Sequence, residues 1–150
     1  MKCVNQGLKV RLYPDEDMMI KINQNIGNSR FTWNKLLEDY QNTYKLFKLH
    51  GYTKLKCNMT TFNAMLNMLK KEHAFLYLSE SSSLQQVYRD LIHAFNKFFS
   101  GVGGYPRFKS KKHDKKAFRI QDNSNIKIKP HTIILPKLGE VYYRTSKKIS

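Results

Sequence analysis

The sequence predicts an α+β fold in which a bundle of about four α-helices is inserted into a β-sheet or barrel that is split along the chain. The chain starts with a segment of alternating apolar and basic residues, its middle part repeats apolar residues at helical spacing, and alternation returns after Pro106. A strand needs partners along its edges, and the candidates for the first strand lie roughly 100 residues further on. The helices between them therefore interrupt one sheet or barrel.

The first strand is predicted at residues 8–12, where basic residues alternate with apolar ones and share the solvent face. Tyr13-Pro14 ends this strand. A first helix is expected to begin at the acidic residues 15–17, whose charges suit the positive end of a helix dipole. Gly27 is a typical stop for such a helix.

Three further helices are predicted by apolar stripes. The second begins at a Ser29 cap and ends near Gly51. The third begins at Thr60 or Thr61 and runs out near residues 71–72, and the fourth begins at serines 81–83, which are typical capping residues. Glycines from residue 101 onward end the fourth helix.

The last third of the chain has the period of strands. Residues 126–129 and 132–135 are predicted as two strands joined by a turn, and residues 141–144 as a third. The chain stops directly after it, which favours a truncated piece of a longer protein. The expected organisation is a first barrel strand at 1–13, a helical lobe at 15–100 and the remaining barrel strands at 101–150.

Charge points to a polyanionic partner. The chain has 27 Lys and Arg against 11 Asp and Glu, a net charge of +16, and residues 101–150 alone hold 13 basic and 3 acidic side chains. Nucleic acid is the first candidate for such a surface. No stretch approaches 18 apolar residues, so no membrane partner is expected. Cys3 and Cys57 form neither a zinc motif nor a disulfide framework, which favours a reducing, intracellular setting.

Seven short segments, taken together and in order, are similar to one protein family. They are residues 9–14 (Lys-Val-Arg-Leu-Tyr-Pro), 27–37, 83–91, 94–99, 104–112, 126–128 and 135–139. The chain resembles the N-terminal half of TnpB/OrfB proteins, the transposon-encoded RNA-guided DNA endonucleases related to type V CRISPR effectors. The resemblance implies a wedge-type β-barrel interrupted by a helical recognition lobe, which together bind guide RNA and double-stranded DNA at a short motif beside the target.

The resemblance also bears on enzymatic activity, cofactors and cell compartment. In that family a Mg-dependent RuvC-like nuclease domain and a zinc ribbon lie further along the chain, so neither an active site nor a cofactor is expected here. The implied setting is DNA recombination by a transposon in the prokaryotic cytoplasm, at the nucleoid when DNA is bound.

The segment after the fourth helix carries the densest group of candidate contacts to nucleic acid. Cations at alternate residues of an extended chain match the spacing of backbone phosphates. The alternative is a solvated basic linker, and the aromatic Tyr105 is expected to pack a hinge rather than stack on bases. The candidates are Tyr105, Arg107, Lys109, Lys111, Lys112 and Arg119.

A second group lies at the start of the fourth helix. Ser81, Ser82 and Gln85, with Asn63 on the preceding helix, are the candidate readers of a DNA duplex, because helix N-termini bind phosphate and a Gln amide pairs with adenine. The alternative is that the serines only cap the helix and the Gln is solvated.

The remaining candidates lie on the strands, the long helix and one loop. One basic barrel face suited to structured RNA is expected from Lys9, Arg11, Lys127 and Lys129. The alternative is that these cations only protect the sheet edges from pairing with other chains. Basic side chains near the start of the second helix are expected to contact guide RNA, and amides of a polar loop to meet base edges, although a hairpin turn explains the loop as well. These residues are Arg30, Lys35, Gln121 and Asn123.

No catalytic constellation is recognised in the sequence. The five histidines are not at metal-ligand spacing, and no P-loop, GxSxG or HExxH motif occurs. We therefore expect no small-molecule substrate. The alternative to the TnpB-like interpretation is a self-contained basic RNA- or DNA-binding module without a nuclease; a protein-interaction module of basic helices does not explain the charge of the last third.

Overall fold

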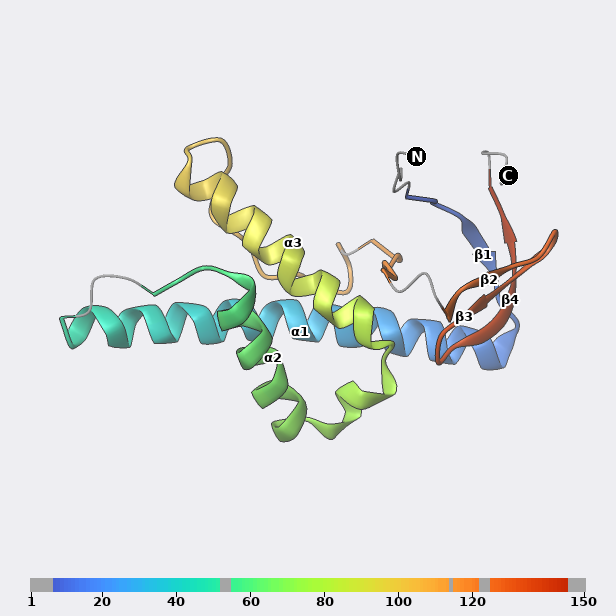
Figure 1. Ribbon diagram of the computed structural model, residues 1–150, viewed down its shortest axis with the longest axis horizontal. Coiled ribbons are helices and arrows are strands. Elements are labelled where there is room, and N and C mark those ends of the chain that lie inside the picture. Colours follow the sequence, from blue (N-terminus) through green and yellow to red (C-terminus); the bar gives the residue numbers. More distant parts are fainter. Residues whose placement is uncertain (1–6, 52–54, 114, 122–124, 146–150) are drawn as a thin grey trace, which may run out of the picture.

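The computed structural model describes residues 7–51, 55–113, 115–121 and 125–145. Three α-helices, one short 3₁₀ helix and a four-stranded antiparallel sheet make up an α+β fold (Figure 1). The elements are β1 (Arg11–Tyr13), α1 (Glu16–Leu49), α2 (Met59–Glu72), η1 (Ala74–Leu78), α3 (Ser81–Phe99), β2 (Lys127–Ile128), β3 (Thr132–Leu135) and β4 (Gly139–Arg144).

The two helices predicted between residues 15 and 50 are one continuous helix of 34 residues, so the predicted break at Gly27 is wrong. The helix starts where expected, because the Asp15 carboxylate accepts a hydrogen bond of 2.8 Å from the Met18 amide. Gly27 lies in the helix interior, and Ser29 is not a cap. The bundle therefore has three long helices rather than about four.

Tertiary hydrogen bonds on either side of Gly27 explain why α1 continues. Asn28 donates a hydrogen bond of 2.8 Å to the Ser79 hydroxyl, and the Asn25 side chain accepts one of 3.0 Å from the Glu80 amide. Both asparagines are buried. A helix-interior glycine costs only about 1 kcal/mol relative to alanine, so these contacts outweigh the local preference.

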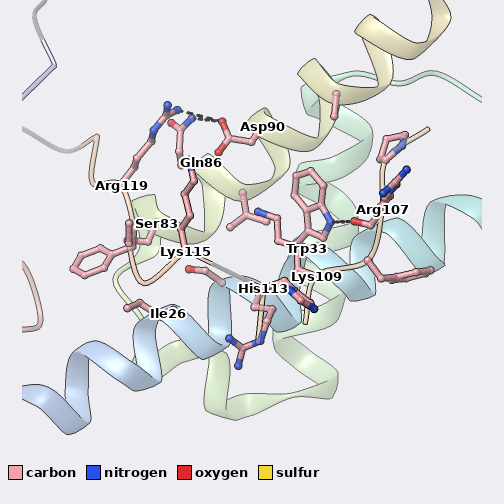
Figure 2. A pocket seen from close by; sticks show the side chains of 18 of the residues that line it. Ile26, Trp33, Ser83, Gln86, Asp90, Arg107, Lys109, His113, Lys115 and Arg119 are labelled. Atoms are coloured by element: carbon pink, nitrogen blue, oxygen red, sulfur yellow. Dashed lines mark hydrogen bonds and ion pairs between the residues drawn. The ribbon is translucent and has the colours of Figure 1, made fainter. Parts of the chain in front are cut away.

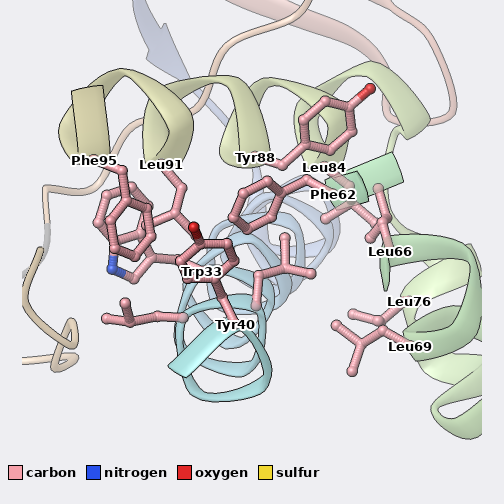
Figure 3. Packing of buried hydrophobic residues seen from close by; sticks show 12 residues of the cluster. Trp33, Tyr40, Phe62, Leu66, Leu69, Leu76, Leu84, Tyr88, Leu91 and Phe95 are labelled. Atoms are coloured by element: carbon pink, nitrogen blue, oxygen red, sulfur yellow. The ribbon is translucent and has the colours of Figure 1, made fainter. Parts of the chain in front are cut away.

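The helices share one apolar core (Figure 3). Tyr40 of α1 lies between Phe62 of α2 and Phe95 of α3, at ring-centroid distances of 5.3 and 4.7 Å. The predicted apolar stripes supply this core, which confirms the helical spacing that was read from them. Its buried members are Trp33, Leu36, Leu37, Tyr40, Phe62, Leu66, Leu69, Leu76, Leu84, Tyr88, Leu91 and Phe95.

The sheet joins the two ends of the chain in the strand order β1-β4-β3-β2. Arg11 of β1 is opposite Arg144 of β4, so the N-terminal strand pairs with the C-terminal one and the predicted split sheet is confirmed. A closed barrel is not: β1 and β2 form the two edges among the described strands. Figure 1 shows the sheet beside the N-terminal end of α1, with α2 and α3 against the middle of that helix.

A glycine substitution tests the continuity of α1. Gly27→Ala should raise the free energy of unfolding by about 1 kcal/mol, since the added Cβ meets only the flexible end of Arg30 at 3.7 Å. Urea unfolding followed by circular dichroism measures this. In the control, Gly101→Ala should destabilise the protein by about 1–2 kcal/mol, because Gly101 has φ +79°. Destabilisation by Gly27→Ala would show that α1 bends there.

Alkaline pH should weaken the helical core through Tyr40. Burial, followed by the nearby Cys57 thiol, raises the pKa of the Tyr40 hydroxyl from 10.0 to about 12. The unfolded chain then loses this proton at lower pH than the folded one, so the free energy of unfolding should fall as pH rises from 10 towards 12. Urea titrations at pH 8 to 11.5 should show a flatter decline for Tyr40→Phe, and no such flattening for Tyr44→Phe, an exposed tyrosine on the same helix.

Candidate nucleic-acid interface

A cleft of about 880 Å³ lies between α1, α3 and the irregular segment that follows α3 (Figure 2). Apolar side chains from both helices form part of its wall, and basic side chains from α1 and from the segment line it. The charged lining residues are Arg30, Arg107, Lys109, Lys115 and Arg119, with Asp90 as the carboxylate.

The first part of that segment, residues 105–113, is here called the strap, and α1 holds it through side chains. The Trp33 indole N–H donates a hydrogen bond of 2.8 Å to the Arg107 carbonyl (Figure 2). Asn34 donates to the Lys109 carbonyl at 2.8 Å and accepts from the Lys109 amide at 2.7 Å. The Asn34 amide thus makes the pair of bonds that a neighbouring strand would make.

Some of the predicted contact residues of the strap are exposed, and others make contacts within the chain. The Lys109 ammonium lies 4.2 Å from the centre of the Trp33 ring, so it makes a cation–π contact. Tyr105 packs edge-on against Phe98 at 5.1 Å, which is the hinge packing expected for it. Lys111 and Lys112 are exposed, as is Arg107, and remain accessible to a polyanion.

Two predicted cations make ion pairs within the chain. Arg119 Nη1 lies 3.3 Å from the carboxylate of Asp90, which also accepts a hydrogen bond of 3.0 Å from Gln86. Lys35 lies 3.5 Å from Glu38 on the exposed side of α1. Because such surface pairs contribute little stability, both cations can exchange their partner for a phosphate. Arg30 lines the cleft.

At the start of α3 a buried carboxylate replaces the predicted serine caps. Glu80, only 4% exposed, accepts hydrogen bonds of 2.7–3.0 Å from the amides and hydroxyls of both Ser82 and Ser83. The Ser82 hydroxyl also accepts a hydrogen bond of 3.1 Å from the backbone N–H of Gln121. Ser82 is therefore buried and hydrogen-bonded within the chain, whereas Ser81 is exposed and Gln85 half-buried.

The other candidate residues with side-chain amides lie on different elements of the structure. Asn63 is exposed on α2, and the Gln121 side chain accepts a hydrogen bond from Arg89. Asn123 falls outside the described residues.

The strands that carry the predicted basic face, β1 and β2, do not pair with each other but form opposite edges of the sheet. β1 carries Arg11 at one edge and β2 carries Lys127 at the other. The register places Arg11 opposite Arg144, and Lys127 opposite Ile134. The exposed Lys9 precedes β1, and the Lys129 ammonium lies 3.4 Å from Glu140 of β4.

The described part of the chain has neither a membrane-spanning helix nor a cluster of metal ligands. No helix in the described part of the chain is long and apolar enough to cross a membrane. Within residues 7–51, 55–113, 115–121 and 125–145, no three His, Cys, Asp or Glu side chains gather where they could hold a metal ion.

Comparison with known proteins places the chain beside DNA-targeting relatives. Residues 1–48 match the family model HTH_OrfB_IS605, described as a helix-turn-helix domain. The chain is 32% identical over 114 residues to "Putative RNA-guided DNA endonuclease" of Streptomyces pristinaespiralis, covering 75% of this chain and 27% of that protein. The chain is therefore similar to the N-terminal part of TnpB/OrfB-type RNA-guided DNA endonucleases. It is also 28% identical over 146 residues to "Putative RNA-guided DNA endonuclease InsQ" of Escherichia coli K12, covering 97% of this chain and 35% of that protein.

These matches confirm the resemblance read from the seven segments, and they fix its extent. The chain spans about a third of the length of these TnpB/OrfB relatives. In the described part of residues 1–48 the structure has β1 and most of α1. The first turn between long helices comes later, between α1 and α2.

Sequence reasoning missed three residues of these surfaces. Glu80 was not predicted as the cap of α3, because the three serines that follow it are of a usual capping type. Lys115 is not among the residues predicted from the sequence, but it lines the cleft. Arg144 was read only as the end of a strand; its position two residues after Tyr142 in an alternating strand is a signal that it shares an exposed face.

Removing the Asn34 side chain should release the strap. Asn34→Ala loses two hydrogen bonds to Lys109, each worth about 0.5–1.5 kcal/mol, so we expect a decrease of about 1–3 kcal/mol in the free energy of unfolding and faster exchange of the Lys109 amide hydrogen. Urea unfolding and hydrogen exchange measure these. Asn42→Ala, at an exposed site of the same helix, should change neither; equal effects of both variants would contradict the role of Asn34.

Proposed function

We propose that this chain is the nucleic-acid-binding N-terminal portion of a TnpB-like RNA-guided DNA endonuclease, which binds guide RNA and a short duplex motif beside the DNA target. The observation that carries the proposal is the docked strap: α1 holds its backbone at Arg107 and Lys109 by hydrogen bonds of 2.7–2.8 Å. A fixed backbone presents its cations at set distances, which suits phosphate binding.

Contact with the DNA duplex is assigned to the helical part. Ser81 and Gln85 lie in the first two turns of α3, where side chains are accessible. Because Glu80 already caps this helix, the helix end itself attracts a phosphate less than an uncapped one would. Recognition there rests on the Gln85 amide, which suits adenine, and on Asn63 of α2.

Guide RNA is assigned to the sheet and the strap, and the strap cations also bind the backbone phosphates of duplex DNA. Lys9, Arg11, Lys127 and Lys129 flank the sheet, which in this proposal forms part of a wedge-type barrel. Cations spaced across a surface suit the A-form backbone, whose shape and phosphates carry recognition. The protein would supply charge and shape, while base pairing by the guide supplies target sequence.

Cleavage of DNA is assigned to the nuclease domain of the full-length family proteins and not to this chain. Two-metal phosphodiester chemistry needs converging carboxylates, and we give no catalytic role to the acids of this chain. In this proposal the Mg²⁺ and Zn²⁺ sites of the full-length family proteins belong to their nuclease domain and zinc ribbon, and the protein acts in the prokaryotic cytoplasm.

The strap cations should determine the salt dependence of binding. Lys111→Glu with Lys112→Glu should make the log–log slope of duplex DNA affinity against salt shallower by about 2, and should weaken binding of structured RNA as well. Fluorescence anisotropy from 50 to 300 mM salt measures both. The control is Lys45→Glu with Lys48→Glu, the same charge change at the far end of α1.

Two outcomes would contradict the proposal. Equal slopes for the two double variants would show that the strap does not bind phosphates. Equal affinity of the wild type for a structured transcript from beside its gene and for an unrelated RNA of the same length would favour a self-contained basic module over a guide-binding one.

A further inference from the structure

Four side chains lie together on the exposed face of the sheet, and of these only Arg11 has a role in the proposed function. β1 and β4 are antiparallel, with Arg11 opposite Arg144 and Tyr13 opposite Tyr142. Residues two apart in a strand point to the same side, so the two arginines and the two tyrosines share one face. The face is called here the Tyr–Arg face, and all four of its side chains are exposed.

The arginine pair is electrostatically unusual. Like charges directly opposite one another in a sheet are destabilising, and no carboxylate in the described part of the chain pairs with either arginine. Instead both guanidinium groups approach the Tyr13 ring, at 5.5 and 5.6 Å from its centre. Such contacts are weak at exposed sites. Tyr13 therefore holds two cations together without neutralising them.

Tyr142 offers the free aromatic surface beside this pair. It is 65% exposed, and among the described residues its ring stacks on no other ring. A tyrosine ring presents a large rigid surface on which a nucleic-acid base can stack, and adjacent cations bind the phosphates that flank the base. Sheet faces that combine exposed aromatic rings with basic groups are suited to unpaired strands, because paired bases hide their faces.

A neighbouring carboxylate favours RNA over DNA. Glu140 lies two residues before Tyr142 on the same side of β4, and its Oε1 accepts hydrogen bonds from Thr132 Oγ1 at 2.6 Å and from Lys129 at 3.4 Å. These bonds lower the pKa of Glu140, which keeps it ionised. A carboxylate repels phosphates but accepts a hydrogen bond from a ribose 2′-hydroxyl, a group that DNA lacks.

We propose that the Tyr–Arg face binds an unpaired RNA nucleotide, with the base stacked on Tyr142, the adjacent phosphates on Arg11 and Arg144, and the ribose hydroxyl near Glu140. The inference rests on the proposed function, since the single-stranded segment would belong to the RNA that this chain binds. It adds a kind of contact that the basic edges of the sheet do not make: recognition of a base that is not paired.

The experiment measures binding of the full chain to a ten-nucleotide adenosine RNA, its DNA counterpart and a fully paired RNA hairpin by fluorescence anisotropy. Tyr142→Leu should weaken binding of the single-stranded RNA about tenfold and leave hairpin binding within twofold, since stacking of one base accounts for roughly 5- to 150-fold in affinity. Tyr142→Phe keeps the ring and should stay within twofold for every ligand. Tyr44→Leu, an exposed tyrosine of α1, is the matched control.

Further arms test the ribose contact and guard against loss of folding. Glu140→Ala should lower the ratio of the affinity for the single-stranded RNA to the affinity for its DNA counterpart at least threefold. If thermal melting shows that Tyr142→Leu is destabilised, Tyr142→Thr removes the ring with a side chain that suits a strand. Crosslinking of 4-thiouridine RNA should label β4.

The possible results separate this inference from the proposed function. Single-stranded RNA binding that is unchanged in Tyr142→Leu and Tyr142→Thr overturns the inference, as does equal loss in Tyr142→Phe. If the wild type binds the hairpin but not the single strand, the inference fails and the proposed function stands. If the wild type binds neither RNA, both fail.

Discussion

The arrangement of the molecule depends on one buried carboxylate. Glu80 accepts hydrogen bonds from Ser82 and Ser83 at the start of α3, while its own amide donates to Asn25 of α1. A buried carboxylate without donors is strongly destabilising, so these partners cannot move away independently. The Ser82 hydroxyl extends the network to Gln121. One group therefore fixes α1, α3 and the segment that leads into the sheet.

The cleft follows from that constraint. With α1 and α3 held at Asn25, the strap crosses α1 about two turns further along, where Trp33 and Asn34 bond its backbone. Mutual repulsion cannot move Arg107 and Lys109 apart, because hydrogen bonds to α1 hold the backbone at these two residues. Fixed cations repel each other in the free protein, and a polyanion removes that repulsion. The fixed cations thus lower the stability of the free protein and favour the binding of a polyanion.

Sequence periodicity predicted the parts of the fold that depend on local spacing. α2, α3, β3 and β4 lie within a few residues of their predicted positions, because each has a regular apolar pattern. The break at Gly27 failed because Asn25 and Asn28 bond residues more than 50 positions away, which no local pattern reveals. The pairing of Tyr13 with Tyr142 likewise depends on a register between strands that lie more than 100 residues apart, which alternation within one strand does not reveal.

The sheet is the part of the fold that gains most from a ligand. Its strands are short, and among the described residues its buried core has four members, Ile133, Leu135, Leu138 and Val141. β1 joins β4 across the whole helical insertion, and contacts so distant in sequence form late and at a high entropic cost. On the opposite face two arginines meet without an acid between them. A bound phosphate strand would offset this repulsion and stabilise the sheet by mass action, so the Tyr–Arg face is most ordered when it is occupied.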